Sequence, residues 1–152
     1  MSARTLISIV GKVSIGVYLI DTNVISEARK GNKANIGVRK FWQSVDEADL
    51  YLPVQTIGEI RRGIENIGRR GDLAQARKLE RWLSLIVDDY SDRVLGFDEA
   101  CAQVWGRLMS PHNQHPIDKQ IAAIALIHGL IVVTRNVEDF RGTGVELQNP
   151  FV

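Results

Sequence analysis

Short apolar runs that end in polar residues recur along this chain, separated by stretches with helical spacing. These runs are rich in β-branched and aromatic residues, which is typical of strands buried on both faces of a sheet; they lie at 17–20, 50–54, 93–97 and 130–134. A shorter run at 145–147 predicts a fifth strand. Because strands alternate with helices and hairpin turns are absent from the pattern, we expect an α/β fold in three layers, α/β/α, around a central parallel sheet of four to five strands.

Six stretches have apolar residues at spacings of three and four, which predicts helices. They lie at 24–30, 35–48, 55–69, 73–86, 98–108 and 117–128. Asp72 and Asp98 are expected to cap the two helices that follow them, and Gly129 to end the last one. The helix at 117–128 is apolar almost all round and is therefore expected to be buried.

The length of 152 residues suits one domain, which we place at 17–152. Residues 1–16 form a leader whose structure the sequence leaves open: disordered, a short extra strand, or a product of start-codon choice. Its apolar run at 6–10 is too short for a signal sequence or a membrane span. Gly11 and Lys12 are not a P-loop, because Val13 follows where that motif needs Ser or Thr.

Composition indicates a soluble protein, with 45% hydrophobic residues, 24% charged residues and a net charge of +1. The single cysteine excludes an internal disulfide and fits a reducing, cytoplasmic compartment. Basic residues gather at 29–40, where no acid occurs, and at 61–81, where seven basic residues face three acids. Such stretches form either a phosphate-binding surface or solvated helix faces.

Three carboxylates stand at positions that favour chemistry. Asp21 ends the first strand, and the carboxyl ends of parallel strands are where ligands bind in such sheets. Glu59 lies early in the helix after the second strand, and Asp118 begins the apolar helix. Two of them have an ordinary alternative role. Asp118 could do no more than stabilise the helix N-terminus by interacting with the helix dipole, and Glu59 could form a surface ion pair with Arg62.

A fourth polar position follows the last long strand, where Asn136 and Asp139 could face the same crevice. Carboxylates gathered in a crevice repel one another unless cations hold them, and all-oxygen ligands suit Mg²⁺ or Mn²⁺. Zinc is not expected, because the cysteine and the histidines lack ligand spacing. We interpret His112 and His115 as loop residues and His128 as a capping residue.

These residues together resemble the PIN-domain ribonucleases, especially the toxins of VapBC/FitAB toxin–antitoxin modules. The resemblance runs from Val17 to Val152 and is carried by four segments in the family's order: 19–27 (LIDTNVISE), 56–64 (with Thr56, Glu59 and Ile60), 118–123 (with Asp118) and 134–140 (TRNVEDF). Each motif alone is weak, but the ordered combination is specific.

The resemblance implies a PIN-like fold and a cytoplasmic Mg²⁺- or Mn²⁺-dependent endoribonuclease, which hydrolyses RNA with metal-activated water. It also implies a homodimer, plasmid stability as a biological setting, and a small antitoxin that occupies the active-site groove. Asp21, Glu59 and Asp118 match the family's metal-binding acids, and Thr22, Asn23 and Thr56 match its supporting polar residues. Asn136 aligns best with the family's fourth acidic position, so a negative charge is missing there. Asp139, three residues on, could substitute for that acid. The resemblance therefore leaves open whether one or two metal ions are bound.

Three other functions compete with this one. A phosphatase with Asp21 as nucleophile resembles the haloacid-dehalogenase pattern, but that pattern needs an aspartate where this chain has Asn23. A dinucleotide-binding module needs a glycine-rich turn after the first strand, which is absent. The third is a catalytically weak or inactive PIN-like domain that binds RNA or a protein partner, which Asn136 would favour.

Overall fold

The computed structural model describes residues 16–152, and the leader expected at 1–16 lies outside them except for Gly16. Five parallel strands form one sheet in the order β3-β2-β1-β4-β5. Their bounds are β1 Tyr18–Ile20, β2 Leu50–Pro53, β3 Val94–Leu95, β4 Ile131–Val133 and β5 Leu147–Gln148. The expected three-layer parallel fold is confirmed, and β5 begins two residues later than predicted.

Six α-helices lie among the described residues: α2 Thr22–Ala28, α3 Ile36–Ser44, α4 Val54–Arg69, α5 Leu73–Asp89, α6 Glu99–Met109 and α7 Pro116–His128. Short 3₁₀ turns add η1 Gly31–Lys33, η2 Glu47–Asp49 and η3 Val137–Phe140. Asp72 and Asp98 accept hydrogen bonds from Gln75 N and Cys101 N, so both predicted caps are confirmed.

The helix predicted at 35–48 is wrong at its end, because α3 ends at Ser44. Val45 is extended, with φ −109° and ψ 154°, and the Asp46 carboxylate then caps η2 by accepting from Ala48 N. A capping aspartate therefore starts a new turn where the apolar spacing seemed to continue. The first helix also starts at Thr22 rather than Val24, because Asp21 serves as its N-cap.

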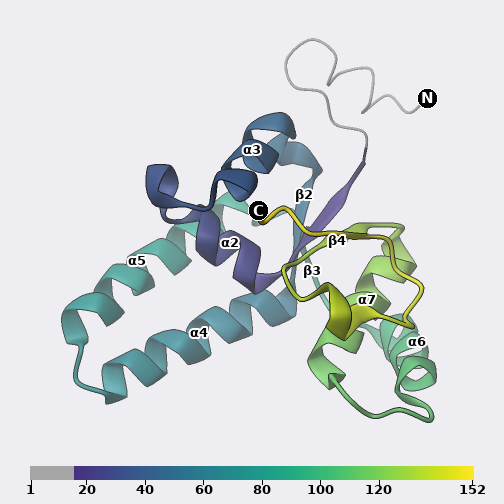
Figure 1. Cartoon of the computed structure of the whole chain (residues 1–152). Coiled ribbons are helices and arrows are strands. Elements are labelled where there is room, and N and C mark those ends of the chain that lie inside the picture. The colour runs from purple at the N-terminus through teal and green to yellow at the C-terminus, as the bar shows by residue number, and fades with distance from the viewer. Residues whose placement is uncertain (1–15) are drawn as a thin grey trace.

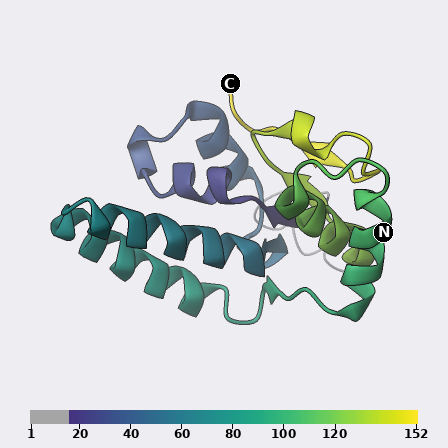
Figure 2. The same cartoon turned by 90° about the horizontal axis from the view of Figure 1, so that it is seen from below.

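Two hydrophobic cores lie on opposite faces of the sheet. The first is built from α2, α3, α4 and α5 and includes Val24, Val38 and Ile60. The second is built from α6 and α7 and includes Cys101 and Ile121. The helices at 54–69 and 73–89 pair as a long antiparallel hairpin that extends away from the sheet, whereas α6 and α7 lie on the other side (Figures 1 and 2).

The central strand β1 belongs to both cores. Its side chains alternate, with Tyr18 and Ile20 in the first core and Leu19 in the second. All three residues are buried, and each such apolar side chain contributes about 2 kcal/mol by leaving water. None of the helices within residues 16–152 has the length and apolar composition needed to cross a membrane.

The order of the strands reverses at the carboxyl end of β1. From β1 the chain builds outward through β2 to β3 and then returns to place β4 on the other side of β1. The direction of building therefore reverses between β1 and β4. In open parallel sheets ligands bind at such a reversal.

Candidate metal centre and active site

Asp21 lies at this reversal and is almost completely buried, with 4% of its surface exposed. Its Oδ1 accepts from the Thr22 backbone N–H at 2.8 Å. Its Oδ2 accepts from the Thr134 hydroxyl at 2.8 Å and from the Asn23 amide at 3.3 Å. Burial raises the pKa of Asp21, and these three hydrogen bonds oppose the rise while the nearby Asp139 adds to it. The strand end thus presents a carboxylate in a fixed orientation.

The side of the crevice toward α4 holds Glu59. Its Oε1 accepts from the Thr22 hydroxyl at 2.7 Å, and that hydroxyl lies 3.1 Å from the hydroxyl of the fully buried Thr56. Glu59 is exposed on its outer side. Loss of solvent around its carboxylate still raises its pKa; the Thr22 hydrogen bond and Arg62 oppose the rise, and the Asp21 charge adds to it. Thr22 therefore links the expected acids of β1 and α4.

Asp118 lies in the first turn of α7 and is half-buried. Burial and the charges of Asp21, Asp139 and Glu59 raise its pKa to about 6, while His115 lowers it. Mutual repulsion of this kind requires that these carboxylates share one neighbourhood. The structure thus brings Asp21, Glu59 and Asp118 together from three separate segments.

The fourth carboxylate is Asp139 rather than a residue at position 136. Asn136 is exposed and begins η3, and its backbone N–H donates to the Thr134 hydroxyl at 3.0 Å. The 3₁₀ turn then brings Asp139 back toward the acids, with Asp139 N donating to Asn136 O at 3.0 Å. Asp139, the substitute considered for Asn136, therefore lies near Asp118 and adds its charge to that neighbourhood.

Two residues of this region were not singled out from the sequence as site residues. Thr134 is fully buried and holds Asp21, but a threonine at a strand end carries no signal of its own. His115, interpreted as a loop residue, lies with Nε2 3.6 Å from Asp139 Oδ1. One ligand atom each from His115, Asp118 and Asp139 lies within 4.8 Å of the others. The pattern of histidines along the chain could not reveal this, because the contact depends on the fold of the loop before α7.

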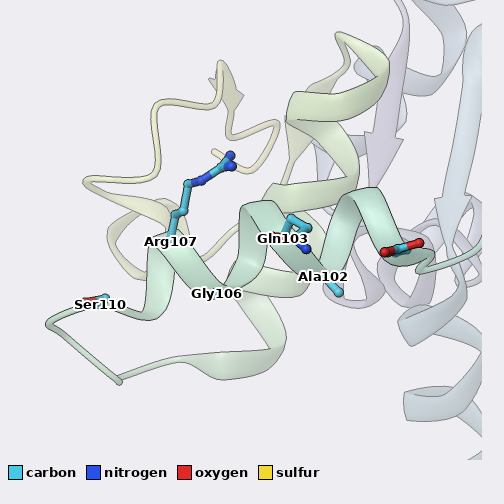
Figure 3. A pocket seen from close by; sticks show the side chains of 6 residues that line it. Ala102, Gln103, Gly106, Arg107 and Ser110 are labelled. Atoms are coloured by element: carbon cyan, nitrogen blue, oxygen red, sulfur yellow. The ribbon is translucent and has the colours of Figure 1, made fainter.

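A cavity of about 410 Å³ is lined by Asp139 and His115, but not by Asp21, Glu59 or Asp118. Its wall also carries Lys119, which is buried and donates to the His112 carbonyl at 2.6 Å. Another pocket, of about 530 Å³, lies along α6 and is shown in Figure 3. Its lining consists of small, polar and charged side chains of α6 and the residue after it, and it contains none of the expected site residues. We therefore place the candidate site at the acids.

The donor set suits a hard divalent cation. The cluster supplies carboxylate oxygens from Asp21, Glu59, Asp118 and Asp139, and burial together with neighbouring negative charge raises the pKa values of Asp21, Glu59 and Asp118. A cation among them would relieve this repulsion, and Mg²⁺ and Mn²⁺ prefer such oxygen ligands. Thr22 and Asn23 donate to the carboxylates of Glu59 and Asp21, and Thr56 accepts a hydrogen bond from the Thr22 hydroxyl.

Known proteins are similar to this chain in sequence, and solved structures are similar to it in fold. The plasmid stability protein StbB of Pseudomonas syringae pv. tomato is 33% identical over 142 residues, covering 89% of this chain and 99% of that protein. Toxin FitB of Neisseria gonorrhoeae is 31% identical, covering 89% and 99%. The VapC ribonuclease Y4jK of Sinorhizobium fredii is also 31% identical, covering 89% and 98%.

Among solved structures, that of FitAcB from Neisseria gonorrhoeae superimposes with a TM-score of 0.71 at 31% identity, covering 88% of this chain and 98% of that chain. The family profile of the PIN domain matches residues 18–145, which span all the elements that carry the acids. The chain therefore belongs to the PIN-domain family and, within it, resembles the proteins named as FitB and VapC toxins.

Proposed function

We propose that this protein is a Mg²⁺- or Mn²⁺-dependent endoribonuclease that acts as the toxin of a type II toxin–antitoxin module. The observation that carries the proposal is the meeting of four carboxylates at the reversal point of the sheet, where burial and the charges of the other acids raise the pKa of Asp118 to about 6. Buried carboxylates are costly unless something pairs with them. The similarity to proteins named as a VapC ribonuclease and toxin FitB supports the same activity.

Asp21, Glu59 and Asp118 would hold the ion, with Asp139 as the fourth acid. A bound divalent ion supplies two effects: it lowers the pKa of a bound water and neutralises charge on the phosphodiester. The protein's own contribution is orientation. Thr134 and Asn23 hold one face of Asp21, and Thr22 holds Glu59, so the carboxylates need not reorganise when RNA binds.

Basic residues beside the crevice would attract the RNA backbone. Arg62 lies one turn from Glu59 and its charge lowers the pKa of that carboxyl. Further exposed arginines line α4 and α5. Part of the basic stretch is already paired, since Arg61 contacts Glu80 at 2.6 Å. The unpaired remainder would give an affinity independent of RNA sequence that weakens as salt rises.

A cognate antitoxin is the proposed partner. The solved neighbours include the structure of FitAB bound to a DNA fragment. By analogy, a small antitoxin would cover the acids of this chain with a basic side chain, and the toxin would form a homodimer in the cytoplasm. Growth arrest on expression, relieved by co-expression of the adjacent small gene, tests this role; arrest that the neighbouring gene does not relieve contradicts it.

Substitution of Asp21 tests the nuclease directly. Asp21→Asn keeps the shape of the side chain but removes its charge, so RNA cleavage in Mg²⁺ should fall at least about a hundredfold. Asp88→Asn removes an exposed carboxylate on α5 and is the matched control, expected to cleave like the unmodified protein. Circular dichroism establishes that both variants are folded. Undiminished cleavage by folded Asp21→Asn, or cleavage that survives EDTA, would refute the proposal.

The inactive RNA-binding domain is the less favoured alternative. It gained support from the amide at position 136, but Asp139 occupies the neighbourhood of the other acids. Binding of RNA without cleavage at any Mg²⁺ or Mn²⁺ concentration would restore it.

A further inference from the structure

We propose that His115 is a nitrogen ligand of a cation held together with Asp118 and Asp139, and that this position therefore takes Mn²⁺ in preference to Mg²⁺. The inference rests on the proposed function in so far as it adds a ligand to the same centre. It concerns the side of the cluster formed by the start of α7 and by η3.

The three side chains come from three different segments and converge. His115 precedes α7, Asp118 lies in its first turn, and Asp139 lies in η3. Their ligand atoms lie within 4.8 Å of one another, and Nε2 of His115 is 3.6 Å from Oδ1 of Asp139. Ligands about 2.1 Å from one ion in octahedral geometry lie about 3–4.3 Å apart, so small side-chain rotations bring all three onto one ion.

The backbone directs His115 toward this position. It has φ 54° and ψ 54°, and it is the one residue other than glycine with positive φ in the part of the chain that the structure describes. Pro116 follows it, and residues before proline normally stay extended. The helix nevertheless uses His115 as its N-cap, with Lys119 N donating to the His115 carbonyl at 3.0 Å. This left-handed turn ties the imidazole to the helix that carries Asp118.

The chemistry of the set favours a borderline metal. Imidazole nitrogen suits first-row transition metals, whereas Mg²⁺ strongly prefers oxygen. The two carboxylates are hard ligands that suit Mn²⁺, and water molecules would complete the coordination shell of the ion. His115 is half exposed and the cavity of about 410 Å³ beside it opens to solvent, so an ion can enter. The competing interpretation is that His115 only pairs with Asp139 in a salt bridge.

Electron spin-echo spectroscopy of Mn²⁺ bound to the full chain, without RNA, separates these interpretations. Coordinated imidazole gives ¹⁴N modulation of the Mn²⁺ echo, which we expect in the unmodified protein and not in His115→Asn. Asparagine is chosen because it tolerates the left-handed conformation better than most residues. His128→Asn, at the far exposed end of the same helix, is the matched control and should keep the modulation. Loss of the ligand should weaken Mn²⁺ binding about tenfold and Mg²⁺ binding by a smaller factor.

Three results would overturn the inference: modulation that persists in His115→Asn, no modulation in the unmodified protein with Mn²⁺ bound, or no Mn²⁺ binding at all. A second measurement uses only the unmodified protein, so it does not depend on whether His115→Asn folds. In the unmodified protein, substoichiometric Mn²⁺ should broaden the imidazole resonance of His115 before those of His112 and His128, and equal broadening contradicts the proposal. Because no RNA is present, a protein that gives the imidazole signal but fails to cleave RNA refutes the nuclease alone.

Discussion

The two halves of the acid cluster are held in different ways. In the hydroxyl half, which comprises Asp21, Thr22, Thr56, Glu59 and Thr134, short hydrogen bonds fix the carboxylates. In the charged half, which comprises His115, Asp118 and Asp139, an imidazole and two carboxylates lie close together, and burial and repulsion raise the pKa of Asp118 to about 6. The first half is prepared before anything binds, whereas the second is stabilised only when positive charge arrives.

One half of the cluster therefore orients its carboxylates, and the other half provides affinity for a cation. The buried hydrogen bonds around Asp21 stabilise the folded protein with or without a ligand. The repulsion around Asp118 destabilises the protein and is relieved by a cation. Variants in the two halves should therefore differ in how they respond to metal and to pH, and four measurements test the distinction, taken from the largest expected effect.

Divalent metal should stabilise the protein through the charged half. At a Mg²⁺ concentration about a hundred times the dissociation constant, binding to the folded state alone adds about 2.7 kcal/mol to the free energy of unfolding. For a domain of this size that corresponds to a rise of about 8 °C in Tm. Asp118→Asn should lose most of this rise, and EDTA should reverse it in the unmodified protein. An equal rise in both proteins would contradict the assignment of Asp118 to the centre.

Loss of the Thr134 hydroxyl should destabilise the hydroxyl half by about 2 kcal/mol, because Thr134→Val leaves a buried carboxylate without one of its donors. Denaturant unfolding in EDTA measures this value. Ser44→Ala removes the hydroxyl of an exposed residue, which donates to the Phe41 carbonyl at the end of α3, and should cost less than about 1 kcal/mol without changing cleavage. If Thr134→Val unfolds no more easily than Ser44→Ala, the hydrogen bond to Asp21 is not a major support.

The pH dependence should be reversed from that of most carboxylates. The pKa of Asp118 is raised from its ordinary value of 3.8 to about 6 in the folded state. The folded protein therefore binds the proton first, and the contribution of Asp118 to stability falls as pH rises from about 4 to about 6. Burial also raises the pKa values of Asp21 and Glu59, which adds to this trend.

The measurement is a difference between two proteins. In EDTA at pH 7, Asp118→Asn should be about 1–2 kcal/mol more stable than the unmodified protein, and the advantage should vanish near pH 4. Other carboxylates, such as Asp98, have a lowered pKa and the opposite trend, but they are the same in both proteins and cancel. A variant that is less stable at pH 7 would show that Asp118 is not repelled.

The smallest effect is expected at Thr22. Thr22→Val removes the donor to Glu59, which is solvent-exposed on its outer side, so the free energy of unfolding should fall by less than about 1 kcal/mol. The pKa of Glu59 should rise further, because the hydrogen bond that lowers it is lost. A carboxyl NMR titration follows this shift. An unchanged pKa would mean that Thr22 does not orient Glu59.

The sequence predicted those parts of the fold in which local pattern and long-range packing agree. The buried runs became strands, the apolar stretch before Gly129 became α7, and Asp98 became a cap. Asp21 could be placed because parallel strands end at one edge, which fixes where a residue after such a strand must lie. The roles of the acids stay predictions.

The charged half was harder to foresee, and for physical reasons. A 3₁₀ turn after β4 moves the acid three residues past Asn136 to Asp139, and no apolar period marks such a turn. The left-handed turn at His115 contradicts the usual conformation before proline, so local preference pointed away from it. Both features depend on packing between α7 and η3, which are brought together by the sheet.

Because the side chains of β1 alternate between two cores, the register of this strand fixes the position of Asp21. A shift of this strand by one residue would exchange Leu19 with its neighbours between the cores. It would also displace Asp21 by about 3.3 Å, more than the tolerance of a metal ligand. A single-residue insertion or deletion within the strand should abolish the proposed RNA cleavage even where the chain still forms a compact structure.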